Sequence, residues 1–133
     1  MSASNALNAG IYSKLTSGTA LVAALGGTAI YHMQAPDNQP LPYVVWSLAA
    51  GGKTPDHDIV NRVEWVRAYA ISAAQAGTIC ALFDVLLDGA VLTVTNWTNI
   101  GLTAEDDIEL VETPPDGGHV YTTGRYYRVI LDK

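Results

Sequence analysis

Cysteine, long apolar runs and secretion signals are scarce or missing in this 133-residue chain, and each absence excludes a class of protein. Cys80 is the single cysteine, which excludes an intrachain disulfide and a cysteine-based metal cluster within one chain. No apolar run approaches the roughly 18 residues that cross a bilayer. The first ten residues lack the basic and apolar regions of a secretory signal, so we expect folding in a cytoplasm.

Positive charge is scarce as well. Thirteen acidic residues against seven basic ones give a net charge of −6. Proteins that grip nucleic acid phosphates or anionic membranes need clustered lysines and arginines, so neither task is expected here. Apolar residues make up 49% of the chain and charged residues 15%, which is a globular composition. We expect one domain over residues 1–133.

Hydrophobic periodicity predicts an α+β fold. Leu7, Ile11 and Leu15 recur at helical spacing, and a second helical turn over 20–25 stops at a glycine pair. Ser72 caps the clearest helix, which we place over 73–88. Strands are predicted over 29–33, 43–48, 60–71, 91–94, 107–112 and 121–131. This order indicates a mostly antiparallel sheet with two main helices packed on one face.

Alternation along the predicted strand 60–71 separates bulky side chains from small ones. Trp65, Arg67 and Tyr69 lie on its odd face, whereas the even face is small and partly polar. Because bulky side chains fill cores, we expect the odd face to meet the core. Arg62 and Glu64 would then lie on the other face.

The stretch Gly52-Lys53-Thr54 ends as a phosphate-binding P-loop does. That motif also needs a glycine five residues before Gly52, where this chain has Ser47. It further needs a helix after the lysine, because the free N–H groups of a helix start bind the phosphate. Pro55 and two aspartates follow instead. We therefore interpret this stretch as a long hairpin loop between antiparallel strands, without a nucleotide.

Other candidate chemistry does not form a catalytic set. The stretch 56–58 offers Asp, His and Asp beside His32 or His119, but adjacent residues on an extended segment point in opposite directions. The acidic residues 105–107 fit a solvated corner or a helix cap. Cys80 lies on the apolar stripe of its helix, as a buried structural thiol does. We predict no enzyme activity, no cofactor and no metal site.

Aromatic residues favour packing over nucleic acid binding. Trp46, Trp65 and Trp97 lack interleaved lysines or arginines, so core and interface packing is the better interpretation than base stacking. A compact acidic chain with long loops and aromatic strands typically works through protein contacts, often as an oligomer.

The order of these pieces resembles that of a known family. The pieces are Leu21-Val22-Ala23-Ala24-Leu25-Gly26 before Ile30-Tyr31, then Pro36, Leu41-Pro42-Tyr43-Val44-Val45, the strand ending Ala70-Ile71-Ser72, the helix 73–87, and Arg125-Tyr126-Tyr127-Arg128-Val129. In this order and spacing the chain resembles the tail-completion proteins of long-tailed phages. These are also called tail-terminator or tail-to-head-joining proteins, and the minor tail proteins that cap the tube are similar.

The resemblance implies a structural role in a virion. Such a subunit would form a hexameric ring at the head-proximal end of the tail, stop polymerisation of the tail-tube protein and offer a surface to the head connector. DNA would pass through the lumen without specific binding, and a carboxylate-lined lumen would repel its phosphates. Assembly would take place in the host cytoplasm. The alternatives are a neck or head-completion connector, and a small-molecule or nucleotide-phosphate binding module.

Partner contacts are expected in the two long loops, 51–59 and 113–119, which hydrophobicity does not explain. Their exposed candidates are Lys53, Asp56, Asp58, Asp116 and His119. On the long strand, Arg62, Glu64 and Arg67 are predicted to form subunit-to-subunit pairs.

Overall fold

The computed structural model describes residues 3–53, 59–113 and 118–132. Its elements are α1 (Ala3–Thr16), α2 (Thr19–Leu25), β1 (Ile30–His32), β2 (Tyr43–Lys53), β3 (Ile59–Ala70), α3 (Ala73–Leu87), β4 (Thr93–Val94), β5 (Trp97–Glu112) and β6 (Val120–Asp132). The predicted α+β class is confirmed. In these ranges no helix combines the length and the apolar character that crossing a membrane requires.

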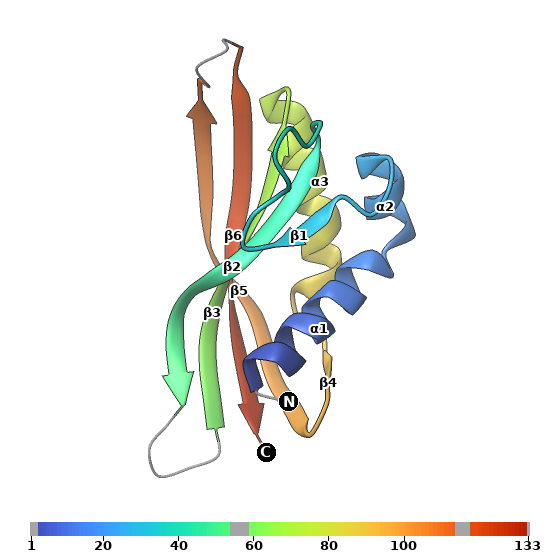
Figure 1. The fold of residues 1–133 in the computed structure, drawn as a ribbon. Coiled ribbons are helices and arrows are strands. Elements are labelled where there is room, and N and C mark those ends of the chain that lie inside the picture. The colour runs from blue at the N-terminus through green and yellow to red at the C-terminus, as the bar shows by residue number, and fades with distance from the viewer. Residues whose placement is uncertain (1–2, 54–58, 114–117, 133) are drawn as a thin grey trace.

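The strands form one six-stranded sheet in the order β1-β2-β3-β6-β5-β4. Every neighbouring pair is antiparallel except β1 with β2, which is parallel. The helices lie on one side of the twisted sheet, as Figure 1 shows. Both the mostly antiparallel sheet and the placement of the helices were therefore predicted correctly.

Helix α3 is the main cover of the sheet. The Ser72 side chain accepts a hydrogen bond from the Gln75 amide at 3.1 Å, which caps the first turn as predicted. Its apolar stripe, including Ile79 and Phe83, is buried against β3 and β6. Cys80 belongs to this stripe and is 7% exposed, which confirms it as a buried thiol.

Two of the tryptophans pack into the core, as predicted. Trp46 is buried, and its Nε1 donates to Asn8 Oδ1 of α1 at 3.1 Å. Trp97 is partly buried against the same core. Indole rings thus fix α1 and the start of β5 on the sheet, because each buries a large apolar area.

The face of β3 that meets the core was predicted wrongly. The even residues Arg62, Glu64, Val66, Ala68 and Ala70 are the buried ones, and the odd residues are half-buried. Small side chains on the even face allow α3 to approach the strand closely. The bulky odd side chains lie on the helix-free face and cover one another there, so size did not decide the side of the core.

The region after α3 is more regular than predicted. Only residues 95 and 96 form a turn, with Asn96 at a φ of 68°, and β5 runs without a break from Trp97 to Glu112. The sequence predicted strand only over 107–112 of this stretch, and that start is corrected. Residues 105–107 are exposed, as expected, but they lie within β5 at a register shift and cap no helix. Pairing with the full length of β6 extends the strand, and register shifts at 99/101 and 104/107 absorb the irregular residues.

The hairpin joining β2 and β3 is confirmed, but its strands are longer than predicted. Gly51, Gly52 and Lys53 belong to β2 and register opposite Arg62, Asn61 and Val60. Residues 54–58 lie outside the described part. A paired strand at Gly52 and Lys53 differs from a P-loop, which wraps a phosphate with its backbone N–H groups.

Candidate assembly surfaces

The helix-free face of the sheet carries a stripe of stacked aromatic rings around one arginine. The Arg67 guanidinium lies 4.1 Å from the Trp65 ring centre and 6.0 Å from that of Tyr69. Tyr69 stacks on Tyr43 at 5.0 Å, and Trp65 contacts Tyr126 at 5.9 Å. Such cation–π and ring contacts hold large half-exposed side chains in fixed positions, which suits a face that meets another protein.

Gly124 of β6 has no side chain, and this leaves space for the ring of Trp65 in the stripe. It registers opposite Arg67, and a Cβ at Gly124 would lie 2.7 Å from the Val66 carbonyl oxygen and 2.9 Å from Trp65 Nε1. Arg67 Nη2 also donates to Ser47 Oγ at 3.0 Å. The predicted interface residue Arg67 is thus held on the helix-free face by its own chain. Its subunit-to-subunit pairing stays a prediction.

Arg62 and Glu64 pair with each other inside one chain, and their predicted pairing between subunits stays a prediction. Arg62 Nη2 lies 2.8 Å from Glu64 Oε1, and the two residues are 7% and 1% exposed. Burial raises the pKa of Glu64 above its ordinary value, and the charge and hydrogen bond of Arg62 oppose that rise. Both lie on the even face of β3, which is the buried one.

The predicted loop residues belong to two different hairpins. The β2–β3 and β5–β6 hairpins extend toward opposite ends of the sheet (Figure 1). His119 is exposed, and its Nδ1 forms a hydrogen bond of 3.1 Å with Thr113 Oγ1. Asp56, Asp58 and Asp116 lie outside the described residues, and of Lys53 the structure describes the backbone.

Two arginines of β6 hold acidic side chains, a feature that was not predicted. Arg125 bridges Asp107 of β5 at 2.5 Å and Asp84 of α3 at 2.8 Å. Arg128 pairs with Glu105 of β5. The acidic residues 105–107 and the two arginines stood apart in the sequence, and only the β5–β6 register brings them together.

Strand β5 has an open edge over residues 105–112. On the side away from β6, β4 pairs only with Trp97 and Thr98. The loop after α3 then covers the next stretch, where Gly89 N donates to the Leu102 carbonyl at 2.8 Å and Asp88 Oδ1 accepts from Ala104 N at 2.9 Å. Beyond that point, no described strand pairs with this edge. We call it the β5 edge.

Strand β2 has a second open edge over residues 48–53. On the side away from β3, β1 pairs with β2 from Val44 to Trp46, and Met33 N donates to the Trp46 carbonyl at 2.8 Å. Within the described ranges, no strand follows β1 along the rest of β2. We call this stretch the β2 edge. Unpaired edges of this kind present rows of N–H and C=O groups to another chain.

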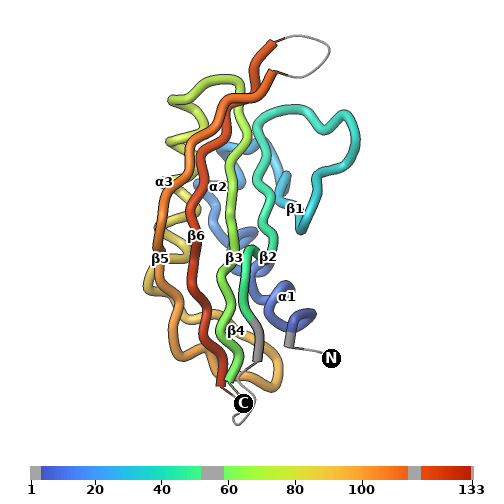
Figure 2. Tube along the Cα trace, turned by 90° about the vertical axis from the view of Figure 1, so that its left-hand side faces the viewer, coloured from blue at the N-terminus to red at the C-terminus, as the bar shows by residue number. Residues whose placement is uncertain are grey.

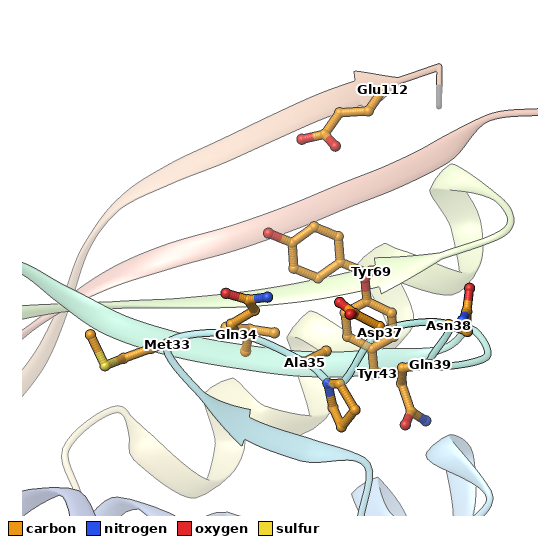
Figure 3. Close-up of a pocket in the computed structure, with 11 residues that line it drawn as sticks. Met33, Gln34, Ala35, Asp37, Asn38, Gln39, Tyr43, Tyr69 and Glu112 are labelled. Carbon is orange, nitrogen blue, oxygen red and sulfur yellow. The ribbon is translucent and has the colours of Figure 1, made fainter. Parts of the chain in front are cut away.

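A polar cavity of about 420 Å³ lies on the helix-free face. Figure 3 shows Tyr43 and Tyr69 on the sheet, the connection with Asp37 beside them, and Glu112 reaching toward the cavity from β5. Glu112 also contributes to a raised pKa of both tyrosines, although burial is the larger cause. In the described ranges no group of three or more His, Cys, Asp or Glu side chains has a geometry suited to a metal ion.

Comparison with known proteins gives a likeness of fold. No protein-family model and no curated protein matches the chain. A solved chain described as "Virion of native gene transfer agent (GTA) particle" superposes with a TM-score of 0.74 at 20% identity, over 98% of each chain. A second solved structure, whose name states no activity, gives 0.60 at 15% identity, over 97% of this chain and 96% of that one. From end to end, this chain therefore has the fold of a component of that virion.

Proposed function

We propose that this chain is a structural virion protein that caps the head-proximal end of a phage tail tube as an oligomeric ring. The ring stops polymerisation of the tube protein and provides the surface to which the head is joined. The observation that carries the proposal is the likeness to a virion component over 98% of both chains. Such coverage involves the whole fold and not a shared local motif. Because folds host many functions, the role needs its own test.

The surfaces support a protein that works by contact. The open edges of β2 and β5 offer backbone groups to neighbours, and the aromatic stripe offers a fixed face. The net charge of −6 disfavours adhesion to DNA, which suits a ring whose lumen DNA crosses. The proposal assigns no catalytic step and no cofactor to any residue.

Removal of the gene tests the role directly. Without a terminator, tube polymerisation has no stop, so tails longer than normal and unjoined heads should accumulate in the lysate. Electron microscopy of tail lengths measures this. Tails of normal length together with binding of the purified protein to filled heads would favour the neck connector instead. Intact infectious particles would overturn both roles.

We keep the hairpin ends as the proposed contacts with the tube and the head connector. Their candidates are Lys53, Asp56, Asp58, Asp116 and His119. Deletion of residues 54–58, which leaves the paired residues of β2 in place, should abolish joining of heads to tails in an extract, while a chain of normal thermal stability is retained. A matched deletion of 114–117 tests the opposite end. Normal joining by either variant removes that hairpin from the list.

A further inference from the structure

A groove lies on the face of the sheet that carries the helices, where the end of β1, the start of α1 and the β2 edge meet. Figure 2 shows these three elements on the same side of the molecule. The groove has a volume of about 490 Å³. Its lining residues are Ser4, Asn8, His32, Met33, Ser47, Leu48 and Arg62. The chain has thirteen acidic residues, yet none of the described residues that line this groove is Asp or Glu.

Arg62 supplies positive charge to the groove. The residue is 7% exposed, and since it lines the groove, the part of it that stays uncovered faces this space. Glu64 lies 2.8 Å from Nη2 of Arg62, but Glu64 is 1% exposed and is not among the lining residues described. The Nε of Arg62 has no hydrogen-bond partner among the described residues. A guanidinium has five N–H donors, so this buried cation retains donors for a further acceptor.

Other lining residues also favour a negative group in this space. Ser4 belongs to the first turn of the 14-residue helix α1, which has no acidic residue there, so the positive end of the helix dipole is not neutralised by its own first turn. Asn8 Oδ1 accepts from the Trp46 indole at 3.1 Å, which leaves the NH2 group of the Asn8 amide to donate. Burial and, second to it, the charge of Arg62 lower the pKa of His32, so the positive field of Arg62 reaches another lining residue.

The groove also has apolar side chains. Met33 is 71% exposed and Leu48 is 48% exposed. Apolar residues on either side of an acidic one would cover them, and a protein segment can supply both kinds of side chain. A nucleic acid backbone is held by clustered lysines and arginines, whereas the described lining of this groove holds one arginine. The groove therefore suits a protein carboxylate better than the phosphates of a nucleic acid.

A copy of this chain at the same height does not supply that carboxylate from β5. The strand registers align Arg62 with Val129 of β6, and Val129 with Leu102 of β5. Residues 99–104 of β5 include neither Asp nor Glu. In a ring whose axis runs along the strands, the adjacent β5 thus brings no acidic side chain to the level of the groove. This favours a different protein as the source of the acid.

We propose that this groove binds a carboxylate from an acidic segment of another virion protein, with Arg62 and the Asn8 amide as its donors. Apolar neighbours of that acid then pack on Met33 and Leu48. The proposal rests on the proposed function, which places this chain among other virion proteins. Hydrogen bonds between charged groups are the strong ones, and arginine is enriched among the residues that dominate binding between proteins.

Titration of the purified chain with two short peptides tests the groove. One blocked peptide has a central glutamate between leucines, and its counterpart has glutamine in place of the glutamate. In nuclear magnetic resonance spectra, the signals of the Trp46 indole and of the Asn8 side-chain amide should shift as the glutamate peptide is added. This peptide should bind about tenfold or more tightly than the glutamine peptide, because a hydrogen bond to a charged group is the stronger one.

Equal affinities of the two peptides would overturn the proposal. A short single-stranded DNA oligonucleotide is the third probe. If it shifts the same signals at a lower concentration than the glutamate peptide does, the assignment to a protein carboxylate is overturned in favour of a phosphate.

A carboxylate placed in the groove should block it. Leu48→Glu makes this change at an exposed lining position and should weaken binding of the glutamate peptide by about tenfold or more. Val85→Glu is the matched control, because it makes the same change of charge at a position of α3 that is 83% exposed and outside the described lining. The control should change the affinity by less than about twofold, since salt screens surface charges away from the site. Equal effects of the two substitutions would overturn the site.

A double variant tests the role of Arg62. Arg62→Gln alone would leave the Glu64 carboxylate buried without its partner, so it is combined with Glu64→Gln. Circular dichroism verifies the fold, and the preference for the glutamate peptide over the glutamine peptide should be lost. A preserved preference would overturn the role of Arg62. If the double variant does not fold, the comparison of Leu48→Glu with Val85→Glu decides.

The groove proposal and the functional proposal fail separately. Without a preference for the glutamate peptide, the groove proposal is overturned, while tail length in the gene deletion still decides the virion role. Intact infectious particles after the gene deletion overturn the virion role, while the peptide titrations of the purified chain still decide whether the groove binds a carboxylate.

Discussion

The hydroxyl of Tyr127 in β6 donates a hydrogen bond to Asp84 Oδ1 of α3, with 2.7 Å between the oxygens. Asp84 Oδ2 lies 2.8 Å from Arg125 of the same strand. One carboxylate thus joins the main helix to the centre of the sheet through two partners. Tyr127 is 1% exposed, and burial together with the Asp84 carboxylate raises the pKa of its phenol.

Removing this hydroxyl should destabilise the fold moderately. Tyr127→Phe keeps the ring but loses the hydrogen bond, and we expect a loss of about 1 kcal/mol in the free energy of unfolding. Asp84→Ala should cost about 1–3 kcal/mol, because it leaves the buried hydroxyl without an acceptor. Urea denaturation of both variants and of the double variant measures the coupling. Additive losses would show that the two groups do not interact.

Stability should depend on pH through Glu64. Because burial raises the pKa of Glu64 in the folded chain, the folded state holds this proton more tightly than the unfolded state. The resulting stabilisation is fully present below the unfolded pKa of about 4.3 and is lost as the pH rises through the folded pKa.

Glu64→Gln removes the titrating group and keeps an acceptor for Arg62. As the pH rises from about 4, the wild type should therefore lose stability relative to this variant. Chemical denaturation at a series of pH values measures it. A difference that grows in favour of the wild type would contradict the prediction.

Gly124 should not tolerate a methyl group. Gly124→Ala would place a Cβ 2.7 Å from the Val66 carbonyl and 2.9 Å from Trp65 Nε1, with a cost of about 1–3 kcal/mol in unfolding free energy. Gly101→Ala on the neighbouring strand is the control, because its Cβ would meet nothing closer than 3.7 Å. The control should be neutral or slightly stabilising, by less than about 1 kcal/mol. Thermal melts compare the two, and equal melting temperatures would show that the stripe moves to make room.

Cys80 should be unreactive in the folded chain. Burial raises the pKa of its thiol to about 11, so little thiolate forms at pH 8. A disulfide reagent should label native protein at least about tenfold more slowly than the denatured chain. Spectroscopic kinetics with and without urea measures this. Fast native labelling would mean that α3 detaches from the sheet readily.

The hairpins and the helix-capping residue could be predicted from the sequence, because they depend on residues that are neighbours in the chain. Ser72 caps its own helix, and the alternation of β3 was recognised correctly. The side of the sheet that faces the core was not readable, since it depends on what α3 packs against. The open edges were not readable either, because strand order and the length of neighbouring strands decide which backbone groups stay unpaired.

The sequence by itself determined the α+β class, the positions of α3, β3 and β6, and the globular, acidic character of the chain. These follow from periodicity, capping and composition, which are local. The tertiary structure alone decided that Arg62 and Glu64 lie buried together, that Arg67 joins the aromatic stripe, and that Arg125 and Arg128 hold the acidic bulge of β5. Each of these depends on strand register and on the closeness of packed layers, which bring together residues far apart in the chain.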